Sequence, residues 1–148
     1  MNRHPYIRAY MAGAIVPTML LLVVITLFFI ARYLYAVPVP VERVVIFPMA
    51  FVPNLFGLWN MLYLWLRPRP HLPIGFHGAL LPFLLVPMGG AGAIALGFLE
   101  LSREGIRWFQ LGALPWAFVV PGFVCILIVY YLLWKYLVGF FNHVIEIG

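Results

Sequence analysis

Four long stretches of the chain carry no charged side chain, and short polar segments separate them. The stretches cover approximately residues 9–31, 44–66, 78–99 and 108–134. An α-helix rises about 1.5 Å per residue, so each stretch is long enough to cross the ~30 Å hydrocarbon layer of a membrane. The pattern therefore predicts four transmembrane helices.

Apolar runs of this length favour helices over the strands of a membrane barrel. Backbone polar groups in lipid must bond within the protein, which leaves helix bundles and closed barrels. Barrel strands alternate apolar and polar residues over about 10 residues, and these runs show no such alternation. The polar segment from Glu100 to Arg107 is predicted to be a short turn. It is too short to fold as a separate domain. We therefore expect an all-α integral membrane protein, with residues 1–148 forming a single four-helix membrane domain.

The composition agrees with this class. Hydrophobic residues make up 66% of the chain and charged residues 9%, whereas about 25% of a soluble domain is charged. The formal net charge of +5 comes mainly from arginines at the ends of the spans, which indicates contact with anionic lipids and not with nucleic acid. The single cysteine, Cys125, excludes an internal disulfide and a CxxC redox pair.

Two parts of the chain resemble each other. The segment 13–17 opens the first predicted helix with Gly-Ala and ends in proline, and the segment 78–82 opens the third in the same way. Ala-Phe-Val lies between two prolines in both 48–53 and 115–121. Chance is the competing explanation, because apolar sequences resemble one another easily. A true duplication predicts two tandem helical hairpins inserted in the same orientation.

This arrangement predicts which segments share a side of the membrane. The N-terminus, the connector 67–77 and the tail 135–148 would lie on one side, with the tail in the membrane interface. The basic residues on that side are Arg3, Arg8, Arg67, Arg69 and Lys135, against Arg32, Arg43, Arg103 and Arg107 on the other. Since the positive-inside rule counts basic residues near span ends, we expect both termini in the cytoplasm of a bacterium and the protein in its inner membrane.

The third predicted helix carries a stripe of small residues. Gly89, Ala93 and Gly97 recur every four positions and so share one helix face. Helices in lipid associate through close van der Waals contact, which small residues permit. The stripe predicts contact with a helix of this chain or of another. Prolines inside the spans predict bent helices, and such bends either open a cavity or only adjust the packing.

Two asparagines, Asn54 and Asn60, lie within the second span. Their side chains point about 120° apart around a regular helix. As interhelical hydrogen bonds each would contribute about 0.6 to 2 kcal/mol, and as ligand contacts they would mark a binding site. The spans contain no Asp, Glu, Lys or Arg, so the buried carboxylate relay of a proton-coupled transporter is not present.

The histidines fall on the predicted side of the termini, beside a stiff proline-rich connector. They are His4, His71, His77 and His143. No two have metal-ligand spacing on a regular helix, so we predict no metal site. Basic and imidazole groups at this depth meet lipid phosphates or a partner protein. The residues expected to make such contacts are Arg67, Arg69, His71 and His77.

Three functions fit these features. The preferred one is a non-catalytic structural or accessory subunit of a larger membrane complex. The second is an oligomeric channel, carrier or binding protein for a small neutral or lipophilic molecule, with Asn54 and Asn60 as contacts. The third, an interfacial enzyme using the histidines, comes last. We predict no catalytic residue and no cofactor, although aromatic residues near the span ends are compatible with bound lipid, quinone or pigment.

Overall fold

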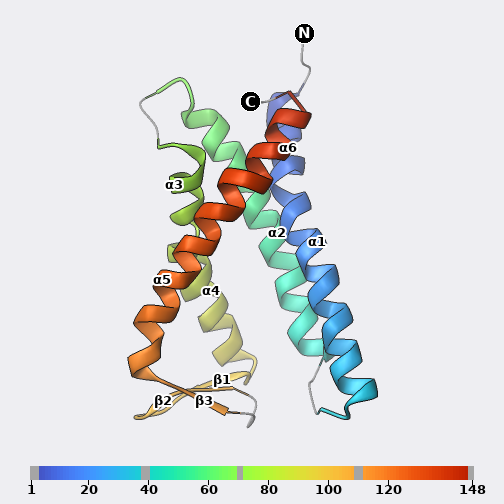
Figure 1. The fold of residues 1–148 in the computed structure, drawn as a ribbon, viewed down its shortest axis with the longest axis vertical. Coiled ribbons are helices and arrows are strands. Elements are labelled where there is room, and N and C mark those ends of the chain that lie inside the picture. Colours follow the sequence, from blue (N-terminus) through green and yellow to red (C-terminus); the bar gives the residue numbers. More distant parts are fainter. Residues whose placement is uncertain (1–3, 38–40, 70–71, 109–111, 147–148) are drawn as a thin grey trace.

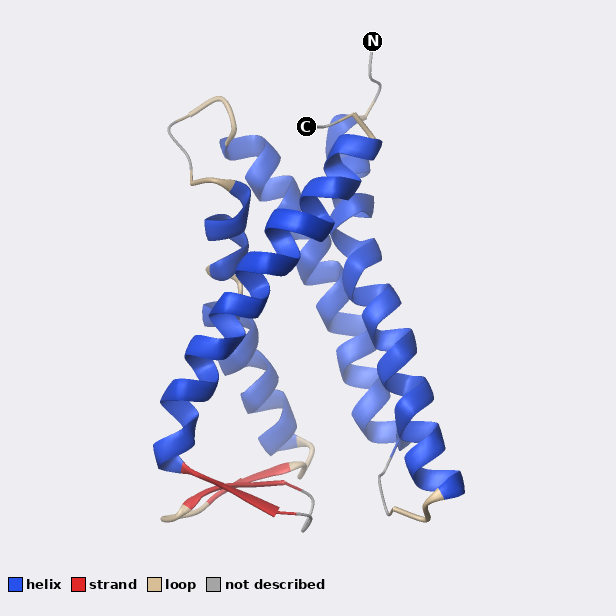
Figure 2. Cartoon of the chain, in the orientation of Figure 1, coloured by secondary structure: helices blue, strands red, loops and turns tan. Residues whose placement is uncertain are grey.

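Two helical hairpins and a small sheet form the molecule (Figures 1 and 2). The computed structural model describes residues 4–37, 41–69, 72–108 and 112–146, without the side chains of 41–50. The first hairpin consists of α1 (Pro5–Leu34) and α2 (Val41–Leu66). The second contains α3 (Ile74–Ala79), α4 (Pro82–Ala95), α5 (Trp116–Leu132), the π-helix η1 (Leu133–Val138) and α6 (Gly139–Val144). Its sheet strands are β1 (Leu99–Leu101), β2 (Gly105–Trp108) and β3 (Gly112–Pro115).

Three helical stretches in the described residues are long and apolar enough to cross a membrane. They are Pro5–Leu34, Ile74–Ala95 and Trp116–Val144. The helix α2 is also long, at 26 residues. These helices support a membrane location. Both termini lie at one end of the molecule, and the sheet lies at the other (Figure 1).

The sheet corrects the expectation of an all-α protein. Leu99–Leu101 pairs antiparallel with β2, and β2 pairs antiparallel with β3. The Ser102 hydroxyl closes the first turn by donating to the Gly105 carbonyl at 2.9 Å and accepting from the Gly105 amide at 3.2 Å. Residues 112–115, predicted as part of the fourth helix, are strand instead. Pro115 disfavours helix in the residue before it, so α5 begins only at Trp116.

The third predicted helix, 78–99, is broken into α3 and α4 and ends early. The break lies at residues 80–81, just before Pro82, which has no N–H to continue the helix. At the other end, Gly97 adopts a left-handed φ of 73°. The Gly97 amide donates to the Ile94 carbonyl at 3.0 Å, and the Phe98 amide donates to the Ala93 carbonyl at 2.7 Å. This is the Schellman pattern that terminates helices.

The fourth helix runs further than predicted. Lys135 does not end it, because η1 and α6 continue without a proline to Val144. The tail expected to lie in the membrane interface is therefore mostly helical. It packs against the first hairpin, and Asn142 within it is only 6% exposed.

The two hairpins meet in one apolar cluster, which we call the joint. Its buried members are Val16, Phe56, Leu81, Leu85, Trp134 and Val138. The Phe56 ring from α2 lies 5.7 Å from the Trp134 ring from η1, centroid to centroid. From the joint the hairpins diverge toward the sheet (Figure 1). None of the α5 side chains, all of which the structure describes, is buried.

Helices approach each other closely at glycines other than those of the predicted stripe. A Cβ added at Gly13 would lie 2.5 Å from the Phe56 carbonyl oxygen and 2.9 Å from Asn60 Cβ, and one added at Gly78 would overlap the Trp134 indole. A Cβ added at Gly89 would meet no atom within 4 Å, and Gly97 lies beyond the end of α4. The predicted stripe is therefore shortened, and its glycines Gly89 and Gly97 make no such close approach within the described chain.

Candidate functional site

A pair of asparagine amides connects the two hairpins. Asn60 on α2 is 1% exposed. Its Nδ2 donates to the Asn142 Oδ1 at 2.7 Å and to the Ala9 carbonyl at 2.8 Å. The Asn142 Nδ2 donates in return to the Asn60 Oδ1 at 3.1 Å. We call Asn60 and Asn142 the amide pair.

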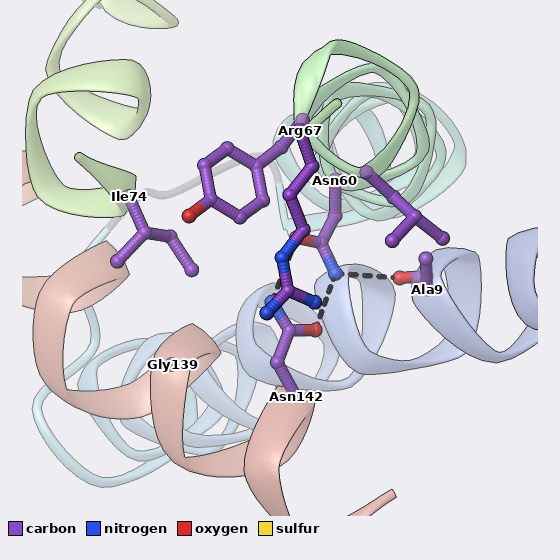
Figure 3. Close-up of a pocket in the computed structure, with 8 residues that line it drawn as sticks. Ala9, Asn60, Arg67, Ile74, Gly139 and Asn142 are labelled. Carbon is purple, nitrogen blue, oxygen red and sulfur yellow. Dashed lines mark hydrogen bonds between the residues drawn. The ribbon is translucent and has the colours of Figure 1, made fainter. Parts of the chain in front are cut away.

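Beside the amide pair lies a pocket of about 160 Å³, which we call the amide pocket. Its walls come from α1, α2, α3 and α6, so both hairpins contribute (Figure 3). The lining residues are Ala9, Asn60, Tyr63, Leu64, Arg67, Ile74, Gly139 and Asn142. The members on α2 and just beyond it recur at helical spacing, which puts their side chains on one face. A volume of this size holds several waters or a small polar group.

Of the two asparagines predicted as a ligand pair, only Asn60 lines the amide pocket. Asn54 is exposed and accepts a hydrogen bond from the Tyr10 hydroxyl on α1. The α2 helix is continuous between the two asparagines, so their side chains stay on different faces. The residue that joins Asn60 is Asn142, which sequence reasoning missed because the tail was predicted to lie in the interface. A single amide in the apolar segment 136–145 was the signal that could have found it.

His77, predicted to be an exposed residue at the membrane surface, lies buried between the two hairpins, where α3 packs against Trp59 and Tyr63 of α2. It is 5% exposed, and its Nε2 lies 3.1 Å from the Trp59 carbonyl oxygen, which can only accept. The Nε2 therefore carries a proton and donates. The Trp59 Nε1 donates in return to the His77 carbonyl at 2.9 Å. The rings of Tyr63 and Trp134 also contact the imidazole, so it is held as a packed core group.

Arg67 and Arg69, also predicted at the membrane surface, lie just beyond the end of α2. Arg67 is exposed and lines the amide pocket. The exposed Arg69 guanidinium lies 4.3 Å from the centre of the Trp65 ring. His71 falls outside the described residues. His4 and His143 are exposed. In the part of the chain that the structure describes, no group of three His, Cys, Asp or Glu side chains is placed to hold a metal ion.

Comparison of the chain with protein-family models, with curated proteins and with solved structures finds no match.

Proposed function

We propose that the chain is a non-catalytic membrane protein with four spanning helices in two tandem hairpins, and that it serves as a structural or accessory subunit of a larger membrane complex. The observation that supports this role most is the divergence of the two hairpins beyond the joint. Their apolar faces toward the sheet are exposed to a large extent. Val120 is 71% exposed and Phe118 61%, and helices of another chain would cover such faces.

The small residues of α4 support the same role. Gly89 and Gly90 would each admit a Cβ without meeting an atom within 4 Å. Small residues permit close contact between helix backbones in lipid, where association depends on van der Waals packing. The close approach that the Gly89–Ala93 stripe predicts is therefore assigned to a helix of another protein.

The hydrogen bonds of the polar side chains within the helices support a non-catalytic role. The buried Asn60 bonds to Asn142 and to a backbone carbonyl. The Thr18 and Thr26 hydroxyls donate to carbonyls one turn back, at 2.7 and 2.9 Å. Such bonds satisfy polar atoms within the protein and need no substrate.

Cys125 provides the test, because it is the chain's single cysteine and is exposed on α5. A photoreactive maleimide attached to Cys125 in native membranes should crosslink the chain to one other membrane protein and give an adduct of defined mass. Cys125→Ser is the matched control and should give no adduct. Crosslinking only to a second copy of this chain, or to many proteins without preference, would contradict the subunit role.

A carrier or binding protein for a small neutral molecule is the second candidate, and the amide pocket favours it. In that case a neutral ligand would raise the melting temperature of the purified chain, and Arg67→Gln would leave this effect unchanged. Crosslinking from Cys125 only between identical chains would add support, since copies of this chain could then enclose a path between them.

A further inference from the structure

The amide pocket has a basic lining. Arg67 is its charged member, and none of the eight lining residues is acidic. Two further basic residues with described side chains belong to the same end of the molecule, Arg8 in the first turn of α1 and Arg69 just beyond the end of α2. Glu146 is also at this end, but it is not part of the lining. The pocket therefore attracts anions.

The amide pair leaves one donor for a ligand. An asparagine amide has two N–H groups, and those of Asn60 are both used, one on Ala9 and one on Asn142. Asn142 gives one N–H to Asn60. Its second N–H has no hydrogen-bond acceptor within the described chain and belongs to a side chain that lines the pocket.

The expected position of the pocket in the membrane matches the level of the phospholipid phosphates. Arg67 directly follows Leu66, the last residue of α2, and in the four-span arrangement proposed above this is where the helix would leave the hydrocarbon layer. Figure 3 shows its side chain extending from the end of α2 across the amide pair. Phosphate groups of phospholipids lie at the boundary where such helices end.

We propose that the amide pocket binds a phosphate group, with the Arg67 guanidinium and the second N–H of Asn142 as donors. A planar guanidinium matches the oxygens of phosphate in pairs, and charged hydrogen bonds of this kind are about twice as strong as neutral ones. Arg67 belongs to the first hairpin and Asn142 to the second, so the bound phosphate bridges the hairpins. A phospholipid and soluble phosphate both carry this group. The proposal is independent of the subunit role.

The test uses the full chain, purified in detergent and stripped of lipid. Native mass spectrometry measures its affinity for phosphatidylglycerol, and for diacylglycerol, which lacks the phosphate. Competition with inorganic phosphate separates the two sources of the group. Arg67→Gln should weaken phosphatidylglycerol binding about tenfold or more, because it removes charged hydrogen bonds. Arg69→Gln is the matched control, with the same loss of charge outside the pocket, and should change the affinity less than about twofold.

The outcomes distinguish the alternatives. Selective binding of phosphatidylglycerol, unaffected by inorganic phosphate, supports a lipid phosphate, and displacement by millimolar inorganic phosphate supports a soluble one. Equal losses from Arg67→Gln and Arg69→Gln would overturn the proposal, as would equal affinity for diacylglycerol. If Arg67→Gln does not fold, Arg67→Lys replaces it. Lysine keeps the charge and loses the paired geometry, so an unchanged affinity in that variant also counts against the proposal.

Discussion

Asn60 and Asn142 form a reciprocal polar contact between the hairpins, as His77 and Trp59 do. Each amide donates to the other, and both are almost fully buried. In lipid an asparagine without a partner is costly, so each residue keeps the other satisfied. The pair therefore holds the two hairpins at a fixed register near the termini.

Removing one member of the amide pair should destabilise the protein. Asn60→Leu deletes three hydrogen bonds and leaves the Asn142 amide without its partner, so we expect the free energy of unfolding to fall by about 1–3 kcal/mol. Equilibrium unfolding in mixed micelles measures this. Asn142→Ala and the double variant complete a thermodynamic cycle. A coupling energy near zero between the two positions would contradict the direct bond.

Gly78 should tolerate substitution far less than Gly89. Gly78→Ala drives a methyl group into the Trp134 indole, and overpacking of this kind costs about 1–3 kcal/mol. Gly89→Ala meets open space in the isolated chain, and since alanine favours a helix interior over glycine it should leave stability unchanged or raise it by up to about 1 kcal/mol. Melting temperatures of the purified variants compare the two. Equal destabilisation would show that α4 is covered within the chain.

At the scale of elements, the ends of the helices decide how much the sequence could predict. Absence of charge located the helix α1 and the end of the helix α2 near Arg67. It failed at 112–115, because an apolar strand and an apolar helix both lack charge, and only Gly112 and Pro115 distinguish them. It failed again at Gly97, which continued a four-residue spacing but ends the helix in a left-handed conformation. It also ended the last helix at Lys135, although a single lysine at the membrane surface does not interrupt helical hydrogen bonding.

The continuity of α5, η1 and α6 can be tested by hydrogen exchange. Backbone amides of 139–144 should exchange at least about tenfold more slowly than those of the turn at 102–104, because they are bonded within a helix packed on α1. Exchange in detergent followed by mass spectrometry gives both rates. Fast exchange throughout 136–144 would contradict the packed helix and favour the interfacial tail that the sequence predicted.

At the scale of the whole molecule, the chain places its termini and the α2–α3 connector at one end and its sheet at the other (Figure 1). The internal duplication predicted that the segments before the first helix, after the second and after the fourth share one side, but the sequence predicted no sheet on the other. It could not predict the joint, since contacts such as Phe56 with Trp134 join residues far apart in the chain and follow from packing alone. The amide pocket could not be predicted either, because its walls come from four helices that are brought together only by packing.

Sidedness should follow from the basic residues near the termini. In a Cys125→Ser background, Ser102→Cys in the sheet turn and His143→Cys near the C-terminus lie at opposite ends. The positive-inside rule puts His143 in the cytoplasm. A membrane-impermeant maleimide should therefore label Ser102→Cys in intact cells and His143→Cys only after permeabilisation. Labelling of both variants in intact cells would contradict this orientation.

The most direct test of the account is the mass of the assembly that this chain forms in its native membrane. The assembly would be extracted in a mild detergent, and native mass spectrometry would measure its intact mass. The subunit role predicts a complex in which this chain and at least one different membrane protein are present in fixed stoichiometry. An assembly built only from copies of this chain, or a single chain with lipid alone, would contradict it.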